Sequence, residues 1–229
     1  MSGTLFGIGV GPGDPELMTV KAWRLVSTAE VIAYLCANGG ESTALEITRP
    51  FLPEQYTAIA IDMPMRVERE AGRAAYDEGC LRIADALQQE KDVVFLCEGD
   101  PFFYGSFMYV FERLAKSHKV VVVPGVTSIT AAAAELRQPL VERDEVLKVL
   151  PATMPAEKLK FELANANAAA IIKVGRHFGK VKSVLRELGL LECATAIEKA
   201  THADQAIHSL TNLEIETLPY FATIIVRRK

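Results

Sequence analysis

The stretch LFGIGVGPGDP at residues 5–15 is an apolar run that ends abruptly in a loop of glycine, proline and aspartate. Two further stretches repeat this design, VVFLCEGDPFFYG at 93–105 and VVVVPGVTS at 120–128. Apolar runs that stop at glycine are typical of buried parallel strands, and the ligands of open α/β domains collect at the carboxyl ends of such strands. The three stretches therefore predict an α/β fold with a binding site at the strand ends.

The glycine spacing of the first loop does not fit a dinucleotide site. Counted from Gly9, Asp14 stands where the third glycine belongs, and counted from Gly7, Pro12 takes that place. Asp14 would repel a pyrophosphate, and Pro12 lacks the N–H that a phosphate cradle needs. The Gly-Lys-Ser/Thr ending of a nucleotide-triphosphate loop is missing as well. These features count against an NAD(P)-dependent oxidoreductase, the less favoured alternative.

The second and third loops carry polar groups beside flat apolar surface. Glu98 and Asp100 precede three aromatic residues at 102–104. Carboxylates, backbone carbonyls and aromatic rings at one strand end suit a sulfonium or adenosyl ligand. In the third loop, Thr127 or Ser128 is a natural N-cap for the alanine-rich segment that follows.

Composition restricts the partners of the chain. It has 229 residues, half of them hydrophobic, and a net charge of −4, which provides no basic field for nucleic acid. We expect neither a membrane span nor a signal segment, and we expect a cytoplasmic location. No metal site is expected, because the histidines are dispersed and the cysteines are widely scattered, at Cys36, Cys80, Cys97 and Cys193.

The hydrophobic pattern predicts alternating strands and helices in two domains, 1–124 and 125–229. Trp23 is expected in the core of the first. The last three strands are too close together for intervening helices, so antiparallel pairing is expected there. The predicted strands are 5–9, 30–35, 92–97, 119–123, 145–150 and 168–175, with three more near 194–200, 205–210 and 220–228; the predicted helices are 19–29, 67–90, 106–117, one that starts at 127 or 128, 155–166 and one that ends near 189.

The three loop motifs, in this order, resemble those of the tetrapyrrole (corrin/porphyrin) methylases. They are GxGPGD at 9–14, EGDPxxYG at 98–105 and PGVTS at 124–128. Three less specific stretches resemble those of the subgroup that methylates C20 of precorrin-2 or of its cobalt complex, cobalt-factor II, in cobalamin biosynthesis. These features are GGESTALEITRPFLP at 39–53, DMPM at 62–65 and QPLVERDEVLKVLPAT at 138–153.

The resemblance implies two α/β domains, an N-terminal one with a mainly parallel sheet and a C-terminal one with a mixed sheet, and an active site in the cleft between them. It also implies a homodimer, a tetrapyrrole substrate and S-adenosylmethionine as cofactor. Residues 221–223 would flank the adenine. The cofactor contacts that it implies are Pro12, Glu98, Gly99, Asp100, Phe103, Thr127, Ser128, Val174 and Ala200.

The resemblance leaves the catalytic side chain open. Relatives that methylate uroporphyrinogen carry an Asp after the strand tyrosine, whereas here Leu35 follows Tyr34. Asp14, Tyr104 and Tyr109 are candidates for orienting the macrocycle or moving its proton. The expected substrate carries eight carboxylates, for which the guanidinium fork is suited. The candidate arginines are Arg66, Arg69, Arg73, Arg137, Arg143 and Arg176, about a third of which we expect to touch substrate.

Other functions of the same fold remain alternatives. A relative of this kind could methylate another ring position, a protein as in diphthine synthesis, or ribosomal RNA, although an RNA enzyme would need more positive charge. A non-catalytic regulatory module would leave the three loops without a purpose. The sequence does not decide whether cobalt is already in the ring.

Overall fold

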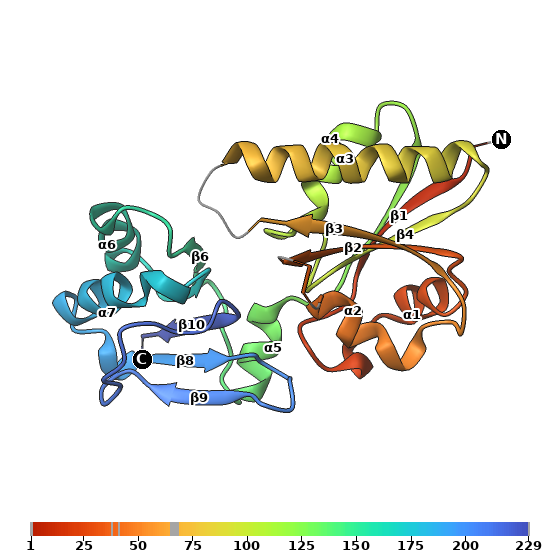
Figure 1. Cartoon of the computed structure of the whole chain (residues 1–229). Helices are drawn as coiled ribbons and strands as arrows, with labels where there is room; N and C mark the ends of the chain where they lie inside the picture. Colours follow the sequence, from red (N-terminus) through yellow and green to blue (C-terminus); the bar gives the residue numbers. More distant parts are fainter. Residues whose placement is uncertain (1, 38, 41, 65–68, 229) are drawn as a thin grey trace. The chain divides into compact units, whose positions relative to one another are not determined.

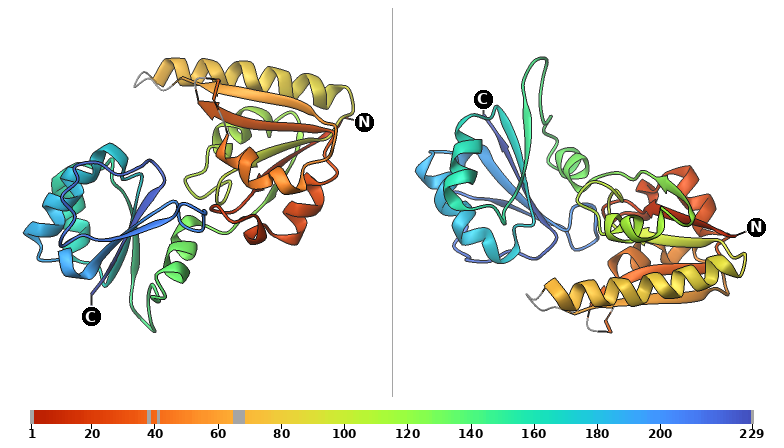
Figure 2. Two further views of the ribbon diagram at one scale, coloured as in Figure 1. Left: turned by 60° about the horizontal axis from the view of Figure 1, so that its bottom comes forward. Right: turned by 90° about the horizontal axis from the view of Figure 1, so that it is seen from above.

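The computed structural model describes residues 2–37, 39–40, 42–64 and 69–228. The chain forms two compact units, residues 1–127 and 128–229. Within the described residues, each unit is built on its own five-stranded sheet (Figures 1 and 2).

The sheet of unit 1 has five strands within the described residues, in the order β3-β2-β4-β1-β5. All of its pairings are parallel, which confirms the predicted parallel α/β arrangement. The strands are β1 (Thr4–Gly9), β2 (Val31–Ala37), β3 (Thr57–Met63), β4 (Val93–Cys97) and β5 (Lys119–Val123). The helices are η1 (Pro15–Leu17), α1 (Val20–Val26), α2 (Thr43–Thr48), η2 (Arg49–Phe51), α3 (Arg69–Gln88) and α4 (Phe107–Leu114).

Helices cover both faces of this sheet, as Figure 1 shows. Helices α3 and α4 bury Ile83, Leu87 and Phe107 on one face. Helices α1 and α2 bury Val26 and Ile47 on the other. The strands inside the sheet are therefore largely apolar on both sides, and their ends are the places available for polar chemistry.

The sheet of unit 2 is mixed and has five strands in the described part of the chain, in the order β6-β7-β10-β8-β9. Strands β6 and β7 pair in parallel, whereas β10 runs antiparallel to both β7 and β8, as β9 does to β8. The antiparallel prediction for the end of the chain is thus confirmed. The strands are β6 (Leu147–Pro151), β7 (Ala168–Ile172), β8 (Ala194–Glu198), β9 (Ala206–Ser209) and β10 (Ala222–Arg227). The helices are α5 (Ser128–Glu135), α6 (Ala156–Ala164), η3 (Gly175–His177), α7 (Phe178–Glu187) and η4 (Leu191–Cys193).

Helices cover both faces of the sheet of unit 2, two longer helices on one face and one short helix on the other. Helices α6 and α7 bury Leu159, Phe178 and Leu185 on one face of the sheet. The short α5 covers the other face with Ile129 and Ala132, against Ile197 and Ile225 of the strands.

Three features of unit 1 differ from the expectations. Helix α2 and strand β3 were not predicted. Trp23, expected in the core, is 46% exposed. Thr19 caps α1 by accepting the N–H of Ala22 at 3.2 Å, and the helix then turns Ala22 and Val26 to the sheet, which leaves Trp23 at the side.

Candidate functional site

The three predicted loops follow three neighbouring strands. Strand β1 lies between β4 and β5 in the sheet, and all three run in the same direction. Their carboxyl ends therefore meet at one edge of unit 1, where the loops starting at Val10, Glu98 and Pro124 leave the sheet. This is the place at which open α/β sheets bind ligands.

Glycines let the three loops approach one another at backbone distance. A Cβ added to Gly125 would lie 2.0 Å from the carbonyl oxygen of Gly99, and one added to Gly9 would lie 2.5 Å from the same oxygen. Gly11 and Gly99 form a small antiparallel bridge, in which the Gly99 N–H donates to the Gly11 carbonyl at 2.8 Å. Both have positive φ, 84° and 63°, which glycine adopts without strain. The glycines are thus required by the packing of the loops.

Asp100 fastens the second loop to the third. One carboxylate oxygen accepts the N–H groups of Phe102 at 2.9 Å and Phe103 at 3.1 Å. The other oxygen accepts the N–H of Gly125 at 3.0 Å. With three N–H groups on its carboxylate, Asp100 shapes the edge of the site.

The Glu98 carboxyl lies beside the start of helix α2. Burial raises its pKa, while hydrogen bonds from its own backbone and from that of Ala44 act in the opposite direction. A carboxyl in such surroundings is a typical feature of a functional site.

The aromatic residues of the second loop divide into two groups. Phe102 packs on helix α4, with its ring 5.0 Å from that of Phe111. Phe103 and Tyr104 meet edge to face at 5.4 Å and are 39% and 42% exposed. Tyr104 also has a φ of 56°, a conformation that is costly for an aromatic residue. All three rings are partly exposed, Phe102 at 47%, and together they form the flat apolar surface that the loop offers to a ligand.

The remaining candidates of unit 1 have ordinary structural contacts. Asp14 caps the short helix η1 by accepting the N–H of Glu16 at 2.8 Å, and Pro12 is half-buried in the same loop. Tyr109 of α4 packs against Tyr76 of α3, with the ring centroids 5.1 Å apart. Thr127 is half-buried and directly precedes α5, whose first residue is Ser128.

The predicted cofactor residues of unit 2 gather at one edge of the second sheet. Strands β7 and β8 both run antiparallel to β10, so their carboxyl ends lie where β10 begins. Val174 follows β7, Ala200 follows β8, and the N–H of Lys199 donates to the carbonyl of Phe221 at 2.8 Å. Val174 is fully buried and Ala200 is 6% exposed, so neither presents its side chain to solvent.

Both of these strand ends contain unusual backbone that the sequence did not reveal. Lys173 has a φ of 56°, Lys199 of 46° and Thr201 of 71°. Such conformations persist only where surrounding contacts enforce them, and they cluster at functional sites. At these two strand ends each of the three lies next to a predicted cofactor residue, Val174 or Ala200.

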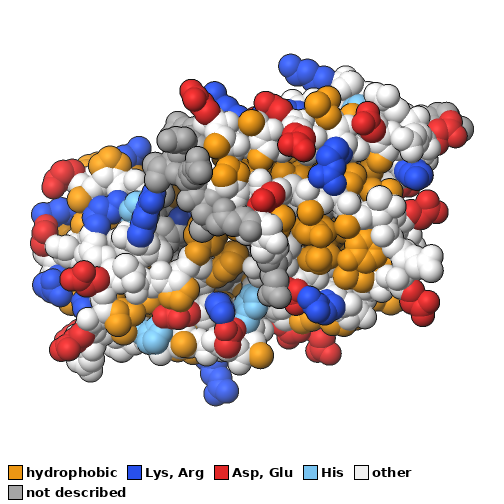
Figure 3. Space-filling view, in the orientation of Figure 1, with side chains coloured by type: hydrophobic (Ala, Val, Ile, Leu, Met, Phe, Trp, Pro, Cys, Tyr) orange, Lys and Arg blue, Asp and Glu red, His pale blue; other side chains and the backbone are white. Residues whose placement is uncertain are grey.

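The arginine candidates are mostly exposed. Arg176 belongs to η3 and lies at the same sheet edge as Val174. Beside it, burial lowers the pKa of His177, and so do the charges of Lys180 and Arg176. Arg73 is exposed on α3, Arg137 follows α5, and Arg143 precedes β6. Arg66 and the side chain of Arg69 lie outside the described residues. In Figure 3 the Lys and Arg side chains are dispersed among Asp and Glu.

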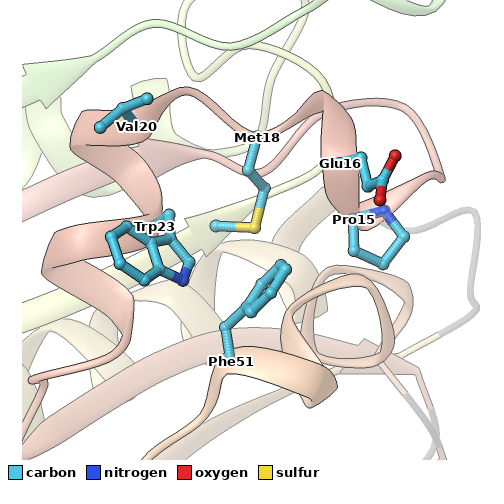
Figure 4. A pocket seen from close by; sticks show the side chains of 6 residues that line it. All are labelled: Pro15, Glu16, Met18, Val20, Trp23 and Phe51. Carbon is cyan, nitrogen blue, oxygen red and sulfur yellow. The ribbon is translucent and has the colours of Figure 1, made fainter.

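An open hollow of about 280 Å³ lies on unit 1, beside the segment that follows the first loop. It is lined by Pro15, Glu16, Met18, Val20, Trp23 and Phe51, and in Figure 4 the side chains of Met18, Trp23 and Phe51 turn toward one another. With one carboxylate among apolar groups, it lacks the convergent polar groups of a cofactor site.

The described residues contain no cluster of three His, Cys, Asp or Glu side chains that could hold a metal ion. Among the same residues, no helix combines the length and the apolar character that crossing a membrane requires.

Comparison with solved structures finds the same architecture. A cobalt precorrin-4 methyltransferase matches with a TM-score of 0.76 and 26% identity, over 98% of this chain and 94% of that one. A uroporphyrin-III C-methyltransferase from Thermus thermophilus, complexed with S-adenosyl homocysteine, matches with a TM-score of 0.70 and 22% identity, over 98% and 97% of the two chains.

Comparison with curated proteins finds relatives along the whole chain. The cobalamin biosynthesis protein CobIJ of Mycobacterium tuberculosis is 40% identical over 96% of this chain, which spans only 45% of that relative's length. The precorrin-2 C(20)-methyltransferase of Sinorhizobium is 34% identical, over 98% of this chain and 95% of its own. The cobalt-precorrin-2 C(20)-methyltransferase of Salmonella typhimurium is 31% identical, over 100% and 98%.

The family model described as tetrapyrrole (corrin/porphyrin) methylases matches residues 4–215, which include the three glycine loops and the strand ends of unit 2. The resemblance stated from the loop motifs is therefore confirmed, and the chain belongs to the tetrapyrrole (corrin/porphyrin) methylase family.

Proposed function

We propose that the protein is an S-adenosylmethionine-dependent methyltransferase that methylates C20 of precorrin-2 or of its cobalt complex in cobalamin biosynthesis. The observation that carries this proposal is the backbone-to-backbone convergence of Gly9, Gly99 and Gly125 at neighbouring strand ends. It is supported by relatives named as C20-methyltransferases that are similar over nearly their whole length.

We propose that the cofactor contacts come from both sheet edges. In unit 1 they are Pro12, Glu98, Gly99, Asp100, Phe103 and Thr127, and in unit 2 they are Ser128, Val174 and Ala200, with 221–223 beside the adenine. The chemistry fits, because the edges offer backbone groups, exposed aromatic rings and carboxylates, which suit a cationic adenosyl ligand. Backbone recognition also explains why Val and Ala suffice at 174 and 200.

Adenosylmethionine supplies a methyl group on a positively charged sulfur, and the thioether that leaves is a good leaving group. The protein's task is then to hold the meso carbon in line with that methyl group and to keep water out, and positioning alone can supply much of the rate. We assign no catalytic side chain. Asp14, Tyr104 and Tyr109 remain predictions for orienting the macrocycle.

The exposed arginines are proposed to bind the substrate carboxylates. Arg176 is the first choice, since it adjoins Val174 at the sheet edge. Replacing Arg176 by Ala should weaken tetrapyrrole binding about 10- to 100-fold, because charge-assisted hydrogen bonds are worth about 1.5–3 kcal/mol. Arg186 of α7, exposed and outside the predicted set, is the matched control. Equal tetrapyrrole affinity in both variants would remove Arg176 from the substrate site.

The decisive experiment is incubation with adenosylmethionine and either precorrin-2 or its cobalt complex. Mass spectrometry should show a gain of one methyl group, and NMR should place it on C20. A methyl group at another carbon would assign the chain to a different member of the family, such as the precorrin-4 type that its fold also matches. The preferred substrate of the two decides the question of cobalt.

We further propose that the protein is cytoplasmic and forms a homodimer. All four cysteines, which lie in the described residues, are free thiols, as in a reducing compartment such as the cytoplasm. The homodimer stays a prediction, with the molar mass in solution as its test.

A further inference from the structure

The turn after strand β8 has a backbone conformation that its residues disfavour. The N–H of His202 donates to the carbonyl of Lys199 at 2.9 Å and closes a turn with Ala200 and Thr201 at its centre. Thr201 has a φ of 71°. Glycine is the usual residue at this position of a turn, and a β-branched residue there is a true outlier. Contacts from outside the turn must therefore hold it.

A chain of side-chain hydrogen bonds holds this turn. The side-chain oxygen Oε1 of Gln205 accepts the N–H of Thr201 at 2.8 Å. The amide nitrogen Nε2 of Gln205 donates to Oε2 of Glu135, the last residue of α5, at 2.7 Å. Lys199 also pairs with Asp204, but a single exposed ion pair contributes little. Glu135 and Gln205 thus connect helix α5 to the strained backbone.

We propose that Gln205, itself held by Glu135, is a positioning residue for cofactor binding. It fixes the turn so that the backbone of Ala200 is ready for its contact with adenosylmethionine, and the inference rests on that proposed contact. Without Gln205 the Thr201 N–H loses its acceptor, and the turn relaxes toward negative φ. Part of the binding free energy is then used to restore the turn. The apparent affinity is the intrinsic affinity multiplied by the fraction of molecules whose turn has the binding conformation.

The expected signature is a loss of binding with the chemistry retained. Gln205 touches the turn and not the reacting atoms, so its removal lowers the binding of ground state and transition state alike. Such a change raises KM and leaves kcat unaltered. A merely structural role would lower the apparent kcat through loss of folded enzyme and leave KM unchanged.

The experiment is calorimetric titration of the full chain with S-adenosylhomocysteine, combined with steady-state kinetics in adenosylmethionine. Gln205→Ala should raise the Kd about 3- to 10-fold, the range of one hydrogen bond, and raise KM alike with kcat within about twofold. Glu135→Ala should act in the same direction more weakly. Lys160→Ala, which breaks an exposed ion pair with Glu187 elsewhere in unit 2, should leave the Kd unchanged.

An exchange of the two side chains tests the hydrogen bonds themselves. Gln205→Glu places a second carboxylate against Glu135 and should weaken binding at least as much as Gln205→Ala. The double variant Glu135→Gln/Gln205→Glu restores the chain, because the carboxylate then at position 205 can accept from both the Thr201 N–H and the new amide at position 135. Its Kd should return to within about twofold of the wild-type value. A folded double variant that stays weak, or a folded Gln205→Ala with wild-type Kd, overturns the inference.

Hydrogen exchange separates this failure from failure of the proposed site. Adding S-adenosylhomocysteine to the wild type should protect the amides of 199–202. Absence of protection there would refute the cofactor contact at Ala200. Protection combined with unchanged affinity in Gln205→Ala would refute only the positioning role.

Discussion

Replacing Gly125 by alanine tests the backbone packing of the three loops most directly. The new Cβ would lie 2.0 Å from the carbonyl oxygen of Gly99 and 2.9 Å from the Cα of Gly9. Both obstacles are backbone atoms, so no side-chain rotation relieves the clash. The Gly99 oxygen would have to move by about 1.4 Å to reach ordinary van der Waals contact at 3.4 Å.

This displacement has a calculable cost. It strains the hydrogen bond from Gly99 to Gly11 and the one from Gly125 to Asp100, each worth about 1 kcal/mol. Overpacking adds about 1–3 kcal/mol. A loss of roughly 3–5 kcal/mol corresponds to a fall in Tm of roughly 10 °C for a chain of this size.

Thermal unfolding followed by circular dichroism measures the fall in Tm, and titration with S-adenosylhomocysteine should show at least a tenfold rise in Kd. Gly72→Ala is the matched control: it lies in α3, its Cβ would meet only the end of Met63 at 3.5 Å, and alanine favours a helix by up to about 1 kcal/mol. Its Tm should stay equal or rise. If Gly125→Ala melts and binds like the wild type, the loops do not depend on this contact.

Three further predictions follow from the same unit. Asp100→Asn replaces one carboxylate oxygen by an NH2 group, which cannot accept the Gly125 N–H. Urea unfolding should show that the free energy of unfolding falls by about 1–3 kcal/mol. Burial raises the pKa of Glu98, so its protonated form stabilises the fold fully below the ordinary pKa of 4.5, and this stability is lost as pH rises through the folded pKa. The unfolding free energy measured against pH should therefore have a smaller slope in Glu98→Gln than in the wild type. An unchanged slope contradicts the prediction. Burial raises the pKa of Cys80 to about 11, so its alkylation by iodoacetamide at about pH 8 should be roughly 100-fold slower than that of a free thiol, as peptide mass spectrometry can measure.

The parts of unit 1 that the sequence predicted well are those with a strict backbone requirement. Close approach of three loops leaves room only for glycine at Gly9 and Gly125, and a positive φ favours it at Gly99. Because each requirement selects glycine, it can be recognised in the sequence. The apolar strands β1, β4 and β5 were equally visible: β4 is buried throughout, β1 is buried at all positions but one, and β5 is a run of four valines after Lys119.

The missed elements lack such a requirement. Helix α2 has six residues, too few for a helical period to show. Strand β3 lies at the edge of the sheet, and only Ile59 and Ile61 are buried in a run that is otherwise small or polar. Trp23 was misplaced because its spacing from Val20 and Val26 fits a buried stripe, whereas Val20 is 78% exposed and begins the helix at the surface.

The two sheet edges solve the same problem by different means. In unit 1 the bridge between the first and second loops has its positive φ values at Gly11 and Gly99, and glycine adopts them freely, although Tyr104 of the second loop also has a positive φ. Unit 2 forces lysine and threonine into the same region and secures at least one of these turns through a side chain, that of Gln205. A turn that uses glycine can be recognised in a sequence. Because glycine is flexible, packing must restrict its conformation. A turn held by a side chain is invisible in a sequence, yet a single substitution can release it. Binding by unit 2 should therefore be the more easily weakened by changes outside the motifs, and the Gln205 variants measure that sensitivity.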